Sequence, residues 1–332
     1  MAEILFERGG VALEATPGTP ITAPTYYLPA RMVLSPRQTV YRPEESRGTR
    51  AQFYRSKVVK QWSEWSLDAA GADVYTLPVL LNMAVASVTS PTTPTGATTA
   101  RLWTFTRSQT SVTERTGTLF WGDPNVQSFR AAYGVVDGFS ITGDASGDEA
   151  VTMAFNGRAR ALEKIATPTW PAQLVGPLVT PLESQLWLDT TSPIGTTAIN
   201  GRVISAAFSV DGLRGDPKFV FAGPSASKTP ARFGIGRTAA TLRLRFELLD
   251  TAQYDLLMNE SVVKARVRFN GPQIEPGFYH YIEIDIYGML DEPEWGEFAG
   301  TNRSFDVTIT SQYDATAGHD WSIKVQNDRT GL

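Results

Sequence analysis

Apolar and polar residues alternate along most of this chain, and this alternation limits the possible folds more than any other feature. A period of two places every second side chain on one face of a strand, as in a half-buried β-sheet. Glycines end several of these segments, as expected for turns between strands. The segments are residues 135–143, 150–157, 204–212, 218–223, 241–249, 281–290, 304–313 and 321–327. We therefore predict an all-β fold, or a β-dominated α+β fold.

Helical periodicity is clear in only two places. Residues 72–85 are rich in apolar side chains, and Pro78 restricts a helix there to one side of itself. Residues 250–260 start with Asp250, a good N-cap, and place apolar residues at helical spacing. We expect one short helix in each half of the chain.

Two pairs of similar segments predict a tandem duplication. FSITG (139–143) precedes TMAFNG (152–157), and FSVDG (208–212) precedes KFVFAG (218–223). Both pairs have a phenylalanine and a closing glycine at matching places. We predict that the paired segments are equivalent strands in two related domains.

Proline-rich stretches suggest where those domains begin and end. Prolines are dense between the two halves, as in an extended connection between domains. The early part of the chain holds many prolines and charges but little continuous alternation. The predicted organisation is an extended N-terminal arm with a charged loop (1–57), a first β-sandwich or barrel domain (58–165), a linker (166–185) and a second such domain (186–332).

Composition excludes several kinds of site. The chain has no cysteine and only two histidines, His280 and His319, so neither thiol chemistry nor a histidine-rich metal site is expected. The formal net charge is −4, which disfavours tight binding to the phosphates of DNA. No apolar run is long enough to span a membrane, and the start of the chain lacks the pattern of a signal peptide.

No catalytic or cofactor motif is convincing either. Residues 233–240 contain Gly-x-Gly-x-x-Ala, but a strand follows where a dinucleotide site needs a helix. The carboxylates near residue 294 are best read as a solvated turn (Asp291, Glu292, Glu294 and Glu297). We therefore predict that the protein is not an enzyme and holds no cofactor or metal.

Basic residues lie on one face of two predicted strands, and they favour protein contacts over nucleic acid. Acidic neighbours and the overall negative charge argue against a stripe that binds DNA. We predict a face that contacts another subunit, formed by Arg243, Arg245, Lys264, Arg266 and Arg268.

These features together resemble the tail tube (major tail) proteins of long-tailed bacteriophages. The element EATPGTP (14–20), followed by APTYYLP (23–29), is similar to the N-terminal arm of many family members. ESRGTR (45–50), the strands that end in Phe-x-Gly and the closing WSIKVQN (321–327) also fit this family.

The resemblance implies a structural virion protein, made in the host cytoplasm, that forms rings. Rings stack into a hollow tube whose channel is lined by a continuous β-barrel. With two domains in one chain, three subunits would complete a pseudo-hexameric ring. The acidic balance then suits a channel through which DNA passes without specific binding. Further partners implied are the tape-measure and tail-terminator proteins, and no membrane is involved.

The resemblance also suggests which residues join subunits. An extended proline-rich arm loses little entropy on docking, so we expect it to anchor on a neighbour through Tyr26, Tyr27, Leu28 and Pro29. The alternative is an intramolecular strap over its own domain. The charged loop is expected to join successive rings through Arg42, Glu44, Glu45, Arg47, Arg50 and Tyr54.

Two other classes of protein remain open. A carbohydrate-binding or adhesive β-sandwich would present exposed aromatic residues, for which Trp62, Trp65, Trp103 and Trp121 are candidates. A different virion part, such as a tail tip, a head–tail connector or a decoration protein, could share the same fold.

Overall fold

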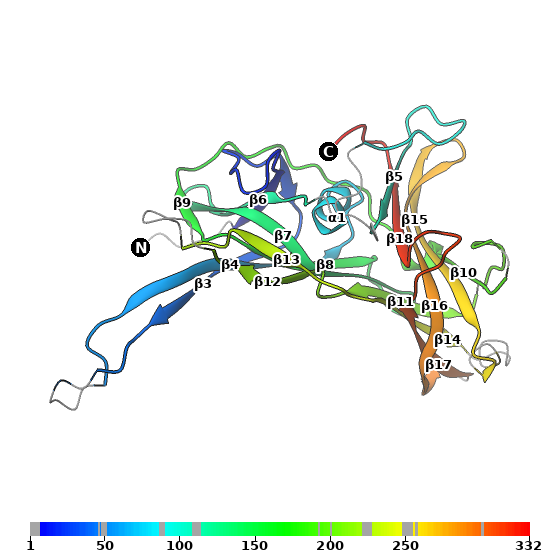
Figure 1. The fold of residues 1–332 in the computed structure, drawn as a ribbon. Helices are drawn as coiled ribbons and strands as arrows, with labels where there is room; N and C mark the ends of the chain where they lie inside the picture. The colour runs from blue at the N-terminus through cyan, green and yellow to red at the C-terminus, as the bar shows by residue number, and fades with distance from the viewer. Residues whose placement is uncertain are drawn as a thin grey trace.

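The structure is a computed structural model, and it confirms a fold made mostly of β-strands (Figure 1). One α-helix, α1 (Leu77–Val85), lies among the described residues. The described residues are 7–45, 47, 52–85, 90–107, 114–191, 193–199, 201–220, 228–247, 255, 258–299 and 302–332.

The strands fall into two halves of the chain. The first half holds β1 (Arg8–Leu13), β2 (Tyr26–Leu28), β3 (Met32–Tyr41), β4 (Lys57–Gly71), β5 (Arg101–Thr106), β6 (Gly117–Asp123), β7 (Gln127–Asp144), β8 (Thr152–Ala159) and β9 (Glu163–Ile165). The second half holds a 3₁₀ turn, η1 (Pro181–Glu183), then β10 (Gln185–Asp189), β11 (Val203–Val210), β12 (Arg214–Lys218), β13 (Arg232–Ile235), β14 (Ala240–Glu247), β15 (Val262–Glu275), β16 (Phe278–Ala299), β17 (Asn302–Ser311) and β18 (Trp321–Asn327).

The two halves share one strand order. In the first half, β7 lies between two layers: one has the order β1-β6-β7-β9, and the other has the order β3-β4-β8-β7. In the second half, β16 has the same place: the layers are β10-β15-β16-β18 and β11-β14-β17-β16. The strand order therefore makes β3 equivalent to β11, β4 to β14, β7 to β16 and β8 to β17.

Rows of buried side chains match the same equivalence. Across the first half, the pairing runs Met32, Leu67, Phe155 and Phe139. Across the second half, it runs Phe208, Leu242, Ile309 and Leu290. Each row faces the core, and every member of both rows is buried.

This alignment differs from the one predicted from sequence. FSITG lies in β7 and FSVDG begins in β11, and the two segments are direct neighbours: Ile141 lies opposite Phe208. The two short motifs therefore lie on the two strands that meet at the junction between the halves, and they are not equivalent strands. The equivalent of β7 is β16.

Antiparallel pairing of β7 with β11 joins the two halves into one continuous sheet. The order of this sheet is β3-β4-β8-β7-β11-β14-β17-β16, and we call it the long sheet. A second link is β5, which leaves the first half to pair with β18. There, the Trp103 indole nitrogen donates a hydrogen bond to Oδ1 of Asn327 at 3.0 Å. Most buried apolar residues from both halves form one cluster, and Tyr133, Val135 and Phe233 form a second, smaller one.

Helix α1 covers the core side of the long sheet and begins where the sequence allows. Pro78 is its second residue, a position where the missing N–H costs nothing. Just before the helix, Asp73 accepts a hydrogen bond from the Tyr75 backbone N–H at 2.8 Å. The second predicted helix, 250–260, lies largely outside the described residues.

The predicted linker is extended up to η1. Residues 166–180 have no regular structure and run back along the first half before β10 begins. The Trp170 ring packs edge-on against Tyr27 at 6.3 Å, and the Val151 N–H donates to the Val179 carbonyl at 2.9 Å. The division into domains at 166–185 stays a prediction, because the long sheet and the core continue across it.

Candidate assembly surfaces

The long sheet has two free edges among the described residues. Strand β3 pairs with β4 on one side and with no strand on the other. The second edge is the C-terminal half of β16, which pairs with β17 from Gly288 onward and leaves β15 after Met289. Figure 1 shows these edges at opposite ends of the molecule. An unpaired edge is a template for another strand.

Geometry makes the two edges compatible with each other. Every neighbouring pair in the long sheet is antiparallel, so β3 and β16 run in opposite directions. A β3 strand placed beside the free edge of β16 would therefore continue the antiparallel pattern.

One face of the long sheet is covered by the core, and the other is polar. Small hydroxyl side chains dominate the polar face near the junction, where the Ser209 and Thr241 hydroxyls lie 2.8 Å apart. This face includes Ser35, Ser66, Ser140, Thr142, Ser205, Ser209, Thr241, Thr308 and Thr310. Near the junction, the described residues of this face are thus mainly small and polar.

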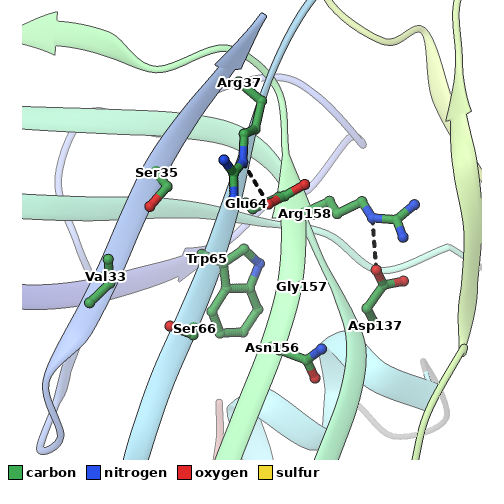
Figure 2. Close-up of a pocket in the computed structure, with 10 residues that line it drawn as sticks. All are labelled: Val33, Ser35, Arg37, Glu64, Trp65, Ser66, Asp137, Asn156, Gly157 and Arg158. Carbon is green, nitrogen blue, oxygen red and sulfur yellow. Dashed lines mark hydrogen bonds and ion pairs between the residues drawn. The ribbon is translucent and has the colours of Figure 1, made fainter.

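Arginines on the polar face are matched by carboxylates. Arg37 lies 2.7 Å from Glu64, and Arg158 lies 2.8 Å from Asp137. These two pairs flank a depression of about 350 Å³, which is also lined by Ser66 and Asn156 (Figure 2). Burial raises the pKa of Asp137, and the charge of Arg158 acts in the opposite direction.

The same pairing holds on the second half. Arg243 lies 3.4 Å from both Glu294 and Asp306, and Arg245 lies 3.5 Å from Asp306. The sequence grouped these two arginines with Arg266 and Arg268 as a face for subunit contact. The structure places Arg243 and Arg245 on the polar face of the long sheet.

Arg266 and Arg268 lie elsewhere, on the layer formed by β15, β16 and β18. Arg266 forms a two-pronged pair with Asp285 at 2.6 and 2.8 Å, and Lys324 lies 2.8 Å from Glu283. Arg268 also pairs with Glu283. Burial acts to lower the pKa of Arg266, but Asp285 and Glu283 raise it overall. This network ties three strands of one chain together.

The predicted arm lies within its own chain, which favours the strap alternative over an anchor on a neighbour. Tyr26 and Leu28 are only 5% and 1% exposed, and β2 pairs with β1. Tyr27 is half-buried beside Trp170, whereas Pro29 is exposed. Tyr26 and Leu28 thus have almost no surface left for a second subunit.

The carboxylate of Glu14 holds part of the EATPGTP segment (14–20) in place. Its carboxylate is 3% exposed and accepts hydrogen bonds from the backbone N–H groups of Gly18 and Tyr133 at 2.7 and 2.9 Å. The hydroxyls of Thr116 and Thr118 donate to it as well. This carboxylate fixes the turn that leads into the strap.

The charged loop forms the tip of a long hairpin made by β3 and β4, which projects from the body (Figure 1). Glu45 pairs with Arg47 and Arg55, each at 2.6 Å, and the Arg47 guanidinium lies 5.2 Å from the centre of the Tyr54 ring. Arg42 and Glu44 also lie in this tip, whereas Arg50 is outside the described residues. Charges at the tip thus pair mainly with each other.

Features of the alternative functions are weak in the structure. Trp65 and Trp103 are 2% and 0% exposed, so they cannot present a surface for sugar. Trp62 and Trp121 are half-buried. Among the described residues, no group of three or more histidines and carboxylates could hold a metal ion. No helix in the described part of the chain is long and apolar enough to cross a membrane.

Comparison with known families decides between the remaining classes. The model of the phage tail tube protein family matches residues 8–294, from the start of β1 into β16. The chain belongs to the phage tail tube protein family. The resemblance predicted from sequence is therefore confirmed, and family membership makes the chain a structural component of a phage virion. No curated protein sequence matches it.

Sequence reasoning missed the two free edges and the hydroxyl-rich face of this tail tube protein. Edges depend on which strands pair, and the pairs in the long sheet join residues far apart in sequence. The hydroxyl-rich face did leave a signal: the polar positions of the alternating segments at 139–143, 204–212 and 304–313 are mostly Ser and Thr.

Proposed function

We propose that three subunits close into a ring by pairing β3 of one with the free half of β16 of the next. Rings then stack into the hollow phage tail tube, with the polar face of the long sheet lining the channel. Within the chain, two tail-tube-like units are joined at residues 166–185. The tube would meet tape-measure and tail-terminator proteins along its length and at its end.

One observation carries the proposal: the junction inside the chain repeats the junction proposed between chains. Inside the chain, β7 pairs with β11, and β7 and β11 are equivalent to β16 and β3. A head-to-tail contact of this kind generates a ring when its rotation closes. Closure also removes both free edges of the sheet.

The equivalence also supplies a register. Phe139 lies opposite Val210 at the internal junction, and their counterparts are Leu290 and Leu34. Pro36 and Pro293 cannot donate a ladder hydrogen bond, so we centre the pairing on Leu34 and Leu290. Next to this edge, a depression lined by Arg8, Pro29 and Arg31 leaves room for an incoming strand.

The matched charges support passage of DNA without specific binding. Each of the four arginines named on the polar face has a carboxylate within 4 Å, so little free positive charge faces the channel. Binding to duplex DNA depends on unpaired cations that replace its counterions. A wall of hydroxyls and ion pairs lets the phosphates slide.

Negative-stain electron microscopy of the concentrated, purified chain tests the proposal. Hollow tubes of uniform width with a regular axial repeat are expected. A chain that stays monomeric at high concentration, or forms solid fibres without a channel, would contradict it.

A further inference from the structure

The β12–β13 ribbon is the second-half counterpart of the outer part of the β3–β4 hairpin. Strand β11 leads into β12, and β13 leads into β14, just as β3 and β4 continue outward beyond Leu34 and Trp65. The second hairpin is bent at Gly212, which has a φ of +70°. Because of that bend, the ribbon leaves the long sheet as a separate two-stranded sheet.

The ribbon docks on the first half of its own chain. Phe233 packs against the Tyr133 ring at 5.6 Å, and both side chains are buried. Arg158 donates to the Gly215 carbonyl at 3.2 Å, and Arg160 donates to the Pro230 carbonyl at 3.1 Å. Arginines at the end of β8 therefore hold the ribbon by its backbone.

Within the chain, the described residues support the outer part of the β3–β4 hairpin along β4, where the Gln61 N–H donates to the Lys228 carbonyl at 2.9 Å and Trp62 packs edge-on against Phe219. Residues 36–39 are all exposed, and the hairpin projects away from the body (Figure 1). Its exposed apolar side chains are Tyr41 at 59%, Val59 at 41% and Phe53 at 45%. A two-stranded hairpin is marginally stable alone in water, so the exposed β3 side and the tip would both be stabilised by a docking surface.

We propose that this hairpin docks on the second half of the neighbouring subunit in the same ring, as the β12–β13 ribbon docks on the first half. The inference rests on the proposed ring. The β7–β11 junction inside the chain places the ribbon on β7 and β8. The equivalent β16–β3 junction between subunits would place the hairpin on β16 and β17 of the neighbour.

The row equivalence predicts which residues meet. Gly157 of β8 corresponds to Ser311 of β17, so Arg158 and Arg160 correspond to Gln312 and Asp314. On the hairpin, Gly215 and Pro230 correspond to Thr39 and Arg55. Thr39 should therefore lie beside Gln312 of the neighbour, and Arg55 should lie near its Asp314.

The receiving surface suits this occupant. Gln312 is exposed, and the apolar side chains of Tyr313 and Met289 are 56% and 38% exposed. On the first half, Arg158 and Arg160 donate to backbone carbonyls of the ribbon, whereas on the second half Asp314 would accept from Arg55 of the hairpin. Arg55 is 71% exposed in the isolated chain.

Cysteine cross-linking tests the contact, because the natural chain has no cysteine. The double variant Thr39→Cys/Gln312→Cys is assembled into tubes, checked by microscopy, treated with a short bis-maleimide and run on a denaturing gel. Within one chain the two positions lie at opposite ends of the long sheet, roughly 30 Å apart at the usual strand spacing. We expect covalent dimers and trimers, with a ladder that stops at three chains.

Three outcomes would overturn the inference. Tubes without cross-links place the hairpin elsewhere, and a ladder that grows without limit places the contact between rings. Dimers formed by Thr39→Cys alone would mean that hairpins meet each other. The control variant Lys60→Cys/Phe219→Cys, whose native side chains are 5.0 Å apart, should cross-link within one chain, assembled or not. If the natural chain forms no tubes, the proposed function fails instead.

Discussion

Ile141 of β7 lies directly opposite Phe208 of β11, and this pairing merges the two halves of the chain into one sheet. Both side chains are completely buried. The side chains at the junction are thus as fully buried as those in the rest of the core. If the same strand pairing also joins neighbouring chains, the β-sheet should continue around the whole ring.

Removal of the hairpin tip should abolish assembly and spare folding. Tyr41 lies opposite Lys57, so residues 42–56 can be replaced by Asn-Gly, the turn that best joins two antiparallel strands. Thermal unfolding of the subunit should stay close to that of the natural chain, while tubes disappear from micrographs. Normal tubes from this variant would show that the tip has no part in assembly.

Deletion of residues 1–30 should instead unfold the chain. Val11, Tyr26 and Leu28 are buried, and β1 pairs with β6 along its whole length. Circular dichroism should show loss of cooperative unfolding. A truncated subunit with native-like unfolding would mean that this segment is a detachable arm after all.

Glu283→Gln should destabilise the subunit by about 1–3 kcal/mol, because it removes a buried charge that pairs with Arg268 and that shares Arg266 and Lys324 with Asp285. Glu283 is 2% exposed and contacts Arg266, Arg268 and Lys324. Glu294→Gln is the matched control, since Glu294 pairs with Arg243 in solvent and such pairs contribute about 0–1 kcal/mol. Urea unfolding measures both variants, and equal effects would refute the distinction.

His280 should make the subunit less stable in mild acid. Burial lowers its pKa, Asp328 acts in the opposite direction, and Nδ1 makes no hydrogen bond. Below about pH 6.5 the unfolded chain therefore takes up a proton that the folded chain resists, so stability falls as the pH drops. His280→Phe should reduce the loss of unfolding free energy between pH 7.5 and 5.5. An unchanged loss would show that other groups cause it.

Unpaired arginines on the channel face should make the tube retain DNA. Asp306→Asn combined with Glu294→Gln frees Arg243 and Arg245 of the carboxylates that the structure places beside them. Tubes of this variant should retain labelled duplex DNA at low salt and release it at high salt. Asp148→Asn/Glu149→Gln changes the net charge equally in an exposed turn and should have no effect. Salt-sensitive retention of DNA by tubes of the natural chain would contradict the proposal that carboxylates neutralise the arginines of the channel wall.

Sequence patterns predicted the strands well but not their partners. Alternation placed β8, β11, β14, β17 and β18 within a few residues, because each has one buried face. The pairing partners of the strands were not predicted, because β7 and β16 each belong to two layers. These strands are 18 and 22 residues long. Local motifs cannot show such sharing, and the resulting alignment of FSITG with FSVDG was wrong.

The position of the predicted arm within its own chain could not be predicted from the sequence for a similar reason. A three-residue strand among prolines carries no periodic signal, and only tertiary packing buries Tyr26 and Leu28. The charged loop was recognised, but its support by two long strands was not, because exposed hairpin strands have no buried face to create alternation.

Cryo-electron microscopy of assembled tubes tests the ring most directly. We predict three subunits per ring, with Leu34 of one subunit beside Leu290 of the next in an antiparallel ladder and the Ser209–Thr241 face toward the channel. A different number of subunits per ring, or a ring in which β3 and β16 of neighbouring subunits do not pair, would contradict it.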